Sequence, residues 1–414
     1  MKLEILPHLD DPSYLEKLYR NNKLAFKKEF TTLYPGLKGK PLADFWHERL
    51  NFETDELNWG NGRELGLVLM ASLCAGLLAK LPAIFSLPVE FFYSRNIGFI
   101  IFPALAAYFS WRQKLSSVKI ALLAIAILIG VLYINLLPNE PQSDTLTLSC
   151  IHLIIVLWAL LGFVFVGNRT NSIGRRLEYL QYNGDLVVIS ALICIAGAMM
   201  TGITIGLFSL IGLEIGEFYF KNFVIFFLPA VPIFGTFLIQ SNPLLVGKVS
   251  PVIAKIFSPL VLVMLFIYLI AMVYSGKNPY NDREFLLIFN LLLIGVLAII
   301  FFSVAETSKN TQNRTELWIL LLLSIVTITV NCIALSAIVF RIAEWGITPN
   351  RAAVLGANLL ILINLGLVTR QFLMALSGRA TIQGVGHTTA RYLPLYAIWA
   401  LIVTFLFPFL FGFQ

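Results

Sequence analysis

Charged side chains are scarce in this chain. Asp, Glu, Lys and Arg make up only 13% of its 414 residues, and hydrophobic residues make up 58%, against about 25% and about 45–50% in soluble domains. A soluble fold is therefore excluded. Uncharged apolar runs of about 20 residues recur along the chain, which is the length that a helix needs to cross roughly 30 Å of hydrocarbon. The sequence predicts an all-α, polytopic helical membrane protein.

Residues that carry chemistry are equally few. The four cysteines all fall within apolar runs, where a thiol behaves as a small hydrophobe, and their spacing fits neither a disulfide framework nor a metal site. No carboxylate pair, histidine cluster or nucleophile–base spacing appears at a predicted membrane face. We therefore expect no metal, no cofactor and no catalytic residue, and an enzyme is the least favoured function class.

Ionisable residues within the predicted spans are also rare. No acidic residue lies deep in a span, so the carboxylate relay expected of a proton-driven pump is missing. Lys80 lies near the end of the first span, and we expect its stem to carry the ammonium group to the lipid headgroups. His152 lies about two turns into the fourth span, where we expect a structural histidine with a hydrogen-bond partner.

The net charge of +7 lies outside the N-terminal region. Residues 1–63 carry ten basic and ten acidic side chains, so the whole excess belongs to the predicted membrane part. Loop charge that sets membrane topology is the usual cause of such an excess. Nucleic-acid binding is not needed to explain it, and no nucleic-acid partner is expected.

The N-terminal region is polar and contains no apolar core of a cleavable signal peptide. Apolar residues recur at helical spacing between residues 13 and 34, and Gly36 supplies a stop signal, which together predict one amphipathic helix. Residues 42–52 predict a second, short helix. The two helices either pack on each other or lie on the membrane. The apolar face of the second helix consists of Phe45, Trp46 and Leu50.

We predict that residues 64–414 form a transmembrane bundle and that residues 1–63 form a cytoplasmic helical region. Basic residues divide thirteen to six between the two alternating sets of loops, and the set richer in basic residues is the cytoplasmic one. The N-terminus is then cytoplasmic and the C-terminus lies outside. The eleven candidate spans cover about 65–85, 96–111, 118–137, 146–167, 185–211, 222–240, 251–274, 285–305, 316–340, 350–369 and 391–412.

Two spans carry unusual residues. In span six, KNFVIFFLPAVPIFGTFLIQ, prolines remove backbone donors and clash with the preceding turn, so we expect interrupted hydrogen bonding between residues 226 and 235. Such a break either forms a substrate site, as in transporters, or merely kinks a packing helix. The residues concerned are Pro229, Pro232 and Gly235. Span five carries a stripe of small residues, Gly197, Gly202 and Gly206. The stripe either allows close packing of a neighbouring helix or acts as a hinge.

The hairpin between spans nine and ten, residues 341–351, is the densest polar constellation. Gly346 is placed to cap the first helix, and Thr348 suits the N-cap of the second with Pro349 at its first position. The hairpin is either an outward-facing site for an anion or a lipid headgroup, or a capped turn with snorkelling arginines. Its other candidate ligand-binding residues are Arg341, Glu344, Asn350 and Arg351.

Three asparagines extend this candidate site into the membrane. Arg351 and Asn358 are seven residues apart and therefore share one helical face. Asn331 and Asn364 lie at similar depth in the antiparallel hairpin, so we expect the amides to be able to bond to one another.

The segment RIAEWGITPNRAAVLGANLLILINL, residues 341–365, resembles bacterial membrane proteins catalogued as domain of unknown function 4153. The stretch LEKLYRNNKLAFKKEF also looks like the leader of members from the Bacteroidota lineage. The resemblance implies a polytopic protein of the bacterial inner membrane and no mechanism. The matching positions are Arg341, Gly346, Thr348, Asn350, Arg351 and Asn358.

Two functions remain open on this evidence. The first is a transporter or permease-like protein that handles a small-molecule, lipid or other amphipathic ligand. The number of spans and the interrupted sixth span favour this function. The second is a non-transporting envelope sensor or assembly scaffold that binds a cytoplasmic protein through residues 13–51. A water-filled path beside span six would favour the first, and an exposed apolar N-terminal groove the second.

Overall fold

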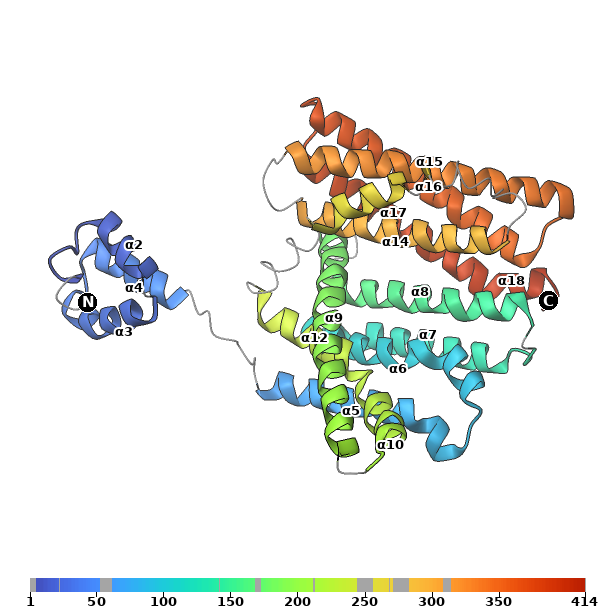
Figure 1. Ribbon diagram of the computed structural model, residues 1–414, viewed down its shortest axis with the longest axis horizontal. Helices are drawn as coiled ribbons and strands as arrows, with labels where there is room; N and C mark the ends of the chain where they lie inside the picture. The colour runs from blue at the N-terminus through green and yellow to red at the C-terminus, as the bar shows by residue number, and fades with distance from the viewer. Residues whose placement is uncertain are drawn as a thin grey trace. The chain divides into compact units, whose positions relative to one another are not determined.

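The computed structural model describes residues 5–21, 23–52, 62–140, 142–167, 173–210, 213–243, 256–267, 269–270, 283–307 and 314–413. Within these ranges the regular elements are all helical, which confirms the predicted all-α class (Figure 1). Internal contacts divide the chain into two compact units, Met1–Trp59 and Gly60–Gln414. They are called the N-terminal unit and the membrane unit below.

The N-terminal unit packs its helices around its own apolar core. These elements are α2 (Pro12–Asn21), α3 (Lys23–Leu33), the 3-10 turn η1 (Tyr34–Gly36) and α4 (Pro41–Phe52). The segment predicted as one helix over residues 13–34 is covered by α2 and α3, and residue 22 between them lies outside the described residues. Phe45 is 58% exposed, contrary to prediction, because the buried face of α4 follows three- and four-residue steps through Ala43, Trp46 and Leu50.

The membrane unit begins with long helices and continues with a broken one. The long helices are α5 (Gly62–Phe85), α6 (Val89–Arg112), α7 (Ser117–Leu136), α8 (Asp144–Val166) and α9 (Ile173–Leu210). The broken helix consists of α10 (Gly216–Tyr219), the π-turn η2 (Phe220–Val224), α11 (Ile225–Phe227) and α12 (Ala230–Ser241).

The second half of the membrane unit is again helical (Figure 1). Its elements are α14 (Arg283–Thr307), α15 (Arg314–Trp345), α16 (Pro349–Leu376), α17 (Ile382–Leu401), the π-turn η3 (Ile402–Leu406) and α18 (Phe407–Leu410). A shorter apolar helix covers Ile256–Ile267.

Seven of the described helices are long and apolar enough to cross a membrane, or eight if the broken helix forms one span. The predicted count of eleven is not confirmed. Helix α6 is not among the seven, because Arg95 and Asn96 interrupt its apolar run. Span 285–305 lies within α14, in which a shorter apolar stretch covers Leu292–Ala305. Span 251–274 contains the short apolar helix Ile256–Ile267 and lies partly outside the described residues.

Polar contacts show which helix ends lie together. Arg112, at the end of α6, binds Glu64 at the start of α5 and the Gln240 carbonyl near the end of α12. At the opposite end of the membrane unit, Ser143 at the start of α8 donates to the carbonyl of Phe413. The start of α5 and the end of the described chain therefore lie at opposite ends of the bundle (Figure 1).

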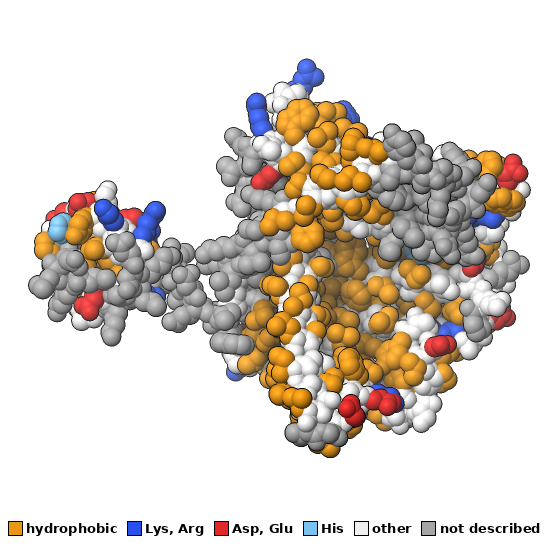
Figure 2. All heavy atoms as spheres, in the orientation of Figure 1, with side chains coloured by type: hydrophobic (Ala, Val, Ile, Leu, Met, Phe, Trp, Pro, Cys, Tyr) orange, Lys and Arg blue, Asp and Glu red, His pale blue; other side chains and the backbone are white. Residues whose placement is uncertain are grey.

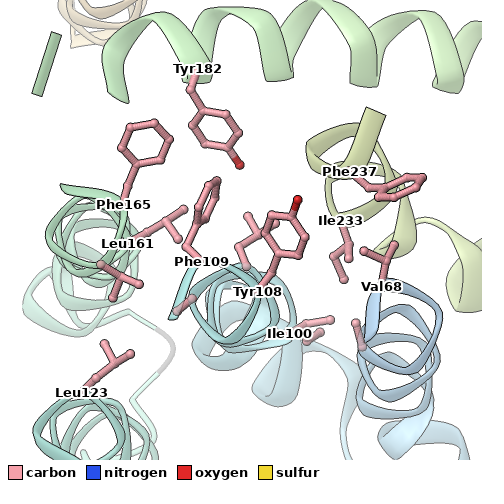
Figure 3. Packing of buried hydrophobic residues seen from close by; sticks show 14 of the residues in the cluster. Val68, Ile100, Tyr108, Phe109, Leu123, Leu161, Phe165, Tyr182, Ile233 and Phe237 are labelled. Carbon is pink, nitrogen blue, oxygen red and sulfur yellow. The ribbon is translucent and has the colours of Figure 1, made fainter. Parts of the chain in front are cut away.

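The largest core cluster lies between α5, α6, α8, α9 and α12 (Figure 3). Helix-to-helix contact elsewhere depends on glycine: a Cβ on Gly184 would overlap Phe302, and one on Gly356 would overlap Trp399. The packing predicted for the glycine stripe of span five is not found among the described residues, because a Cβ on any of its three glycines would meet none of their atoms within 4 Å. Apolar side chains instead cover the visible surface of the membrane unit (Figure 2).

Candidate functional site

The broken helix forms the first part of the candidate site. Its two arms, Gly216–Phe227 and Ala230–Ser241, meet at an angle of 42°, which confirms the predicted interruption. Pro229 is the N-cap residue of α12, and Pro232 lies in the first turn, where its missing amide has no intrahelical partner to lose. Gly235 lies beyond the break and packs on α9, because a Cβ there would be 3.3 Å from Leu186 Cδ1. Pro229 therefore makes the break.

Lys80 binds the first arm of the broken helix. Its Nζ atom donates to the carbonyl oxygen of Lys221 at 2.7 Å and to Asn222 Oδ1 at 3.1 Å. Both acceptors belong to the π-turn η2, and π-turns occur frequently at functional sites. Protein oxygens therefore bind the ammonium group, and its predicted placement among lipid headgroups stays a prediction.

Helix α5 also touches the broken helix beside the bend. A Cβ on Gly76 would lie 2.6 Å from the carbonyl oxygen of Phe226 and 3.0 Å from its ring. Only glycine allows the two backbones to approach this closely. The bend, the π-turn and Lys80 thus form one continuous region along α5.

A second π-turn, η3, provides a reference for the first. The carbonyl oxygen of Thr404 accepts hydrogen bonds from Tyr133 at 3.0 Å and from Ser149 Oγ at 2.9 Å. Ser149 and Thr404 are fully buried. In both π-turns a side chain from a neighbouring helix therefore binds a main-chain carbonyl, but η3 uses neutral hydroxyls where η2 uses an ammonium group.

The predicted asparagines lie in the interior formed by α14, α15, α16 and α17. Asn331 Nδ2 donates to the main-chain oxygen of Asn358 at 3.0 Å, Asn358 Nδ2 donates to Asn290 Oδ1, and Asn364 Nδ2 donates to the hydroxyl of Tyr396. The structure therefore joins Asn331 to Asn358 through the backbone and places Asn364 in a separate pair.

Two buried amide oxygens, those of Asn331 and Asn364, have no hydrogen-bond partner among the described residues. The orientation of the Asn331 amide is fixed, because a main-chain carbonyl can only accept and so requires the nitrogen. An unpaired buried acceptor costs about 1–3 kcal/mol. The α14–α17 interior thus has acceptor capacity for a hydrogen-bond donor.

The hairpin between α15 and α16 has the predicted local structure. Thr348 Oγ1 accepts from the Arg351 amide, Pro349 begins α16, and Gly346 has a φ of +75°, which confirms the caps. Arg351 Nη1 donates to the carbonyls of Trp345 at 3.0 Å and Gly346 at 2.7 Å.

Both candidate arginines of the hairpin lie over one indole ring. The guanidinium carbons of Arg341 and Arg351 are each 5.7 Å from the ring centroid of Trp345. Arg341 is buried, Asn350 is half-buried, and Glu344 is exposed. The hairpin therefore gathers two cations around an exposed aromatic side chain.

Sequence reasoning missed a polar cluster at the other end of the bundle. Glu64 Oε1 accepts from the Tyr108 hydroxyl at 2.6 Å and from Arg112 Nη1 at 2.7 Å, although Glu64 is only 8% exposed. The Tyr182 hydroxyl lies 2.7 Å from Thr236 Oγ1. Figure 3 shows the hydroxyls of Tyr108 and Tyr182 pointing into the space between α6, α9 and α12. These residues lie near the ends of the predicted spans, where polar side chains are common and do not by themselves indicate a cluster.

Sequence reasoning also missed the role of Arg95. Its guanidinium group donates to the carbonyls of Ile134, Leu137 and Pro138 and to Asn139 Oδ1 at the end of α7. The predicted span 96–111 leaves Arg95 in the preceding loop, but its side chain is 3% exposed. The adjacent polar pair Arg95–Asn96, facing Asn135 in the next span, was the available signal. Asn96 and Asn135 exchange two amide hydrogen bonds.

His152 has the structural role that the sequence predicted, because its Nδ1 atom lies 2.9 Å from the carbonyl oxygen of Leu148. Across the part of the chain that the structure describes, no three His, Cys, Asp or Glu side chains gather as metal ligands. No protein-family model matches the chain, and the comparisons with curated proteins and with solved structures find no match either. The resemblance of residues 341–365 to domain of unknown function 4153 stays a prediction.

Proposed function

We propose that the protein is a transporter or permease-like protein that moves a small or amphipathic ligand across a bacterial inner membrane. The 42° break between the two arms of the sixth predicted span carries this proposal. An interrupted helix exposes main-chain groups at membrane depth, and such groups bind substrate in many transporters. The unpaired oxygen of Asn331 adds acceptor capacity within the same unit.

The proposed topology has the Arg112 end of the bundle in the cytoplasm, together with residues 1–63. Basic residues near this end support it, because short cytoplasmic loops carry an excess of Lys and Arg. Lys119 lies over the ring of Phe163 and Arg175 over that of Phe165, so the α6–α7 and α8–α9 connections share this end. The proposed number of membrane crossings remains eleven, and in this topology the hairpin that contains Trp345 lies on the outer side of the membrane.

Cysteine reactivity tests the transport proposal. Phe226 is half-buried against α5, whereas its neighbour Phe227 is 56% exposed on the outer surface. In a background without the native cysteines, Phe226→Cys should react with a charged, water-soluble thiol reagent, because a permeation path is hydrated. Phe227→Cys, the matched control, should face lipid and stay unreactive. An unreactive Phe226→Cys from both sides of the membrane would contradict a water-filled path.

An envelope sensor or scaffold is the second candidate, favoured by the separately packed N-terminal unit. The exposed side chain of Phe45 on α4 is the expected contact point for such a partner. A photoreactive group at residue 45 that crosslinks one defined cytoplasmic protein in cells, combined with an unreactive cysteine at residue 226, would favour this function. A reactive cysteine at residue 226 without a crosslink would favour transport.

A further inference from the structure

The broken helix joins two arms of very different burial. The second arm, α12, buries Ile233, Thr236 and Phe237 almost completely against α5, α6 and α9 (Figure 3). The first arm contains no buried residue in α10, η2 or α11. The bend at Pro229 therefore separates an anchored arm from a weakly held one.

The weakly held region continues into the preceding helix. No described residue of α9 after residue 190 is buried, and Met199, Ile203 and Leu207 are all largely exposed. We call the described residues 197–210 and 213–228 the outer hairpin. Regions with few buried apolar contacts open at low free-energy cost, so the outer hairpin is the least stably held helical segment around the bend.

Both ends of the outer hairpin contain residues that weaken a helix. Pro229 ends it on one side. On the other side, Gly197 and Gly202 have open space around their Cα atoms. A glycine within a helix costs about 1 kcal/mol relative to alanine, and here no packing contact with the described residues offsets that cost. These positions suit hinges.

Two kinds of contact between the first arm and α5 are well defined. One is the close approach of Gly76 to Phe226, and the other is Lys80 with its two oxygen acceptors in η2. The comparison with η3 indicates which contact is releasable. There the buried Ser149 hydroxyl and the half-buried Tyr133 hydroxyl bind the Thr404 carbonyl, whereas the η2 acceptors are exposed and Lys80 can exchange them for water or headgroups.

We propose that the outer hairpin swings as a unit about hinges near Gly197 and Pro229, and that Lys80 is the latch that holds it closed against α5. When the ammonium group leaves η2, the first arm loses its polar attachment and the hairpin moves away from Gly76. This movement opens the side of α5 that the bend covers. The inference concerns a conformational device and does not depend on transport being the function.

Spin-label distances in the full-length protein in lipid nanodiscs test the latch. One label replaces Met70 on α5 and the other replaces Phe218 on α10, and both positions are 61% exposed. Lys80→Met keeps the length of the apolar stem and removes the charge. We expect a single distance population with Lys80 and, with Lys80→Met, a second population displaced by at least about 5 Å, one helical turn.

A control pair and two further variants make the outcomes decisive. Labels at Met70 and at Leu122 on α7 should give the same distance with and without Lys80→Met. Lys80→Arg should restore the single Met70–Phe218 population, and Asn222→Ala, which removes one of two acceptors, should give a smaller second population. An unchanged Met70–Phe218 distance in Lys80→Met would overturn the proposal, because packing alone would hold the hairpin. A change in the control pair would also overturn it, since Lys80 would then support the whole bundle.

Discussion

Cations are neutralised differently in the two units of the chain. In the N-terminal unit, Glu16 receives Arg20 at 2.8 Å and Arg49 at 2.9 Å, so carboxylates pair with guanidinium groups. The membrane unit also contains ion pairs, such as Arg112 with Glu64 at 2.7 Å, but three of its arginines bind main-chain oxygens at the ends of neighbouring helices. Arg95 binds the end of α7, Arg112 the end of α12 and Arg351 the end of α15.

The difference follows from the surroundings of each unit. The last carbonyls of a helix have no intrahelical partner and carry the negative end of the helix dipole. Water satisfies them in a soluble unit, but hydrocarbon cannot. An arginine that reaches such an end satisfies its own donors and the orphan acceptors together. Arg95 and Arg351 are held in this way, whereas Arg112 binds the carboxylate of Glu64 as well as a main-chain oxygen.

The largest effect that this comparison predicts is at Arg95. Arg95→Met should lower the unfolding free energy by about 3 kcal/mol, since a buried charged donor is lost and several carbonyls are left unpaired. Arg49→Met in the N-terminal unit, whose partner is partly exposed, should cost about 1 kcal/mol or less. The loss for Arg95→Met is measured by heating the purified protein and monitoring its aggregation by size-exclusion chromatography. Equal, small losses would remove the distinction between the units.

The packing around tryptophan also differs between the two units. Trp46 fills the core of the N-terminal unit, whereas Trp399 of the membrane unit lies on Gly356. A Cβ at Gly356 overlaps the indole, so Gly356→Ala should cost about 1–3 kcal/mol from overpacking. Gly366→Ala on the same helix, with open space around its Cα, is the matched control and should be neutral or stabilising. Similar losses of folded protein from both variants would contradict the role of close approach.

Arg351 tests whether an arginine at a helix end also serves a ligand. Arg351→Lys keeps the charge but loses the planar fork. If the hairpin binds an anionic headgroup, this variant should bind phosphatidylglycerol about tenfold more weakly, a loss of about 1.4 kcal/mol, with an unchanged amount of folded protein. Native mass spectrometry of the protein with added phosphatidylglycerol measures both. Full binding, or a failure to fold, would leave the hairpin as a structural cap.

The smallest effect concerns pH in the N-terminal unit. The hydrogen bond from Arg20, with further help from Arg49, lowers the pKa of Glu16 below its ordinary value of 4.5. A lowered carboxyl pKa stabilises the folded state above the unfolded pKa, and this stability is lost as pH falls through the folded pKa. Hydrogen exchange in α2 and α4, corrected for its intrinsic pH dependence, should therefore show weaker protection below pH 4.5. Glu16→Gln should remove this change, and a persistent change would assign it to another group.

Local chemistry made part of this structure predictable from sequence. The break at Pro229 and the Thr348 N-cap depend on residues within one or two turns, so proline and threonine patterns were sufficient. The Lys80 and Arg95 contacts could not be predicted, because their acceptors lie far away in sequence, at Lys221 and Ile134, and are main-chain atoms that any residue supplies. Hydropathy likewise identified helical segments without settling which of them cross the membrane.

Side-specific cysteine labelling tests the central claim, a membrane bundle with its Arg112 end in the cytoplasm. Single cysteines near residue 20, at Gln113 and at Ser377 should be protected from an impermeant thiol reagent in intact cells and should react after permeabilisation. Cysteines at Asn139 and Gly346 should react in intact cells. Labelling of the residue 20 or Gln113 cysteine from outside, or equal labelling of both sets, would contradict the account.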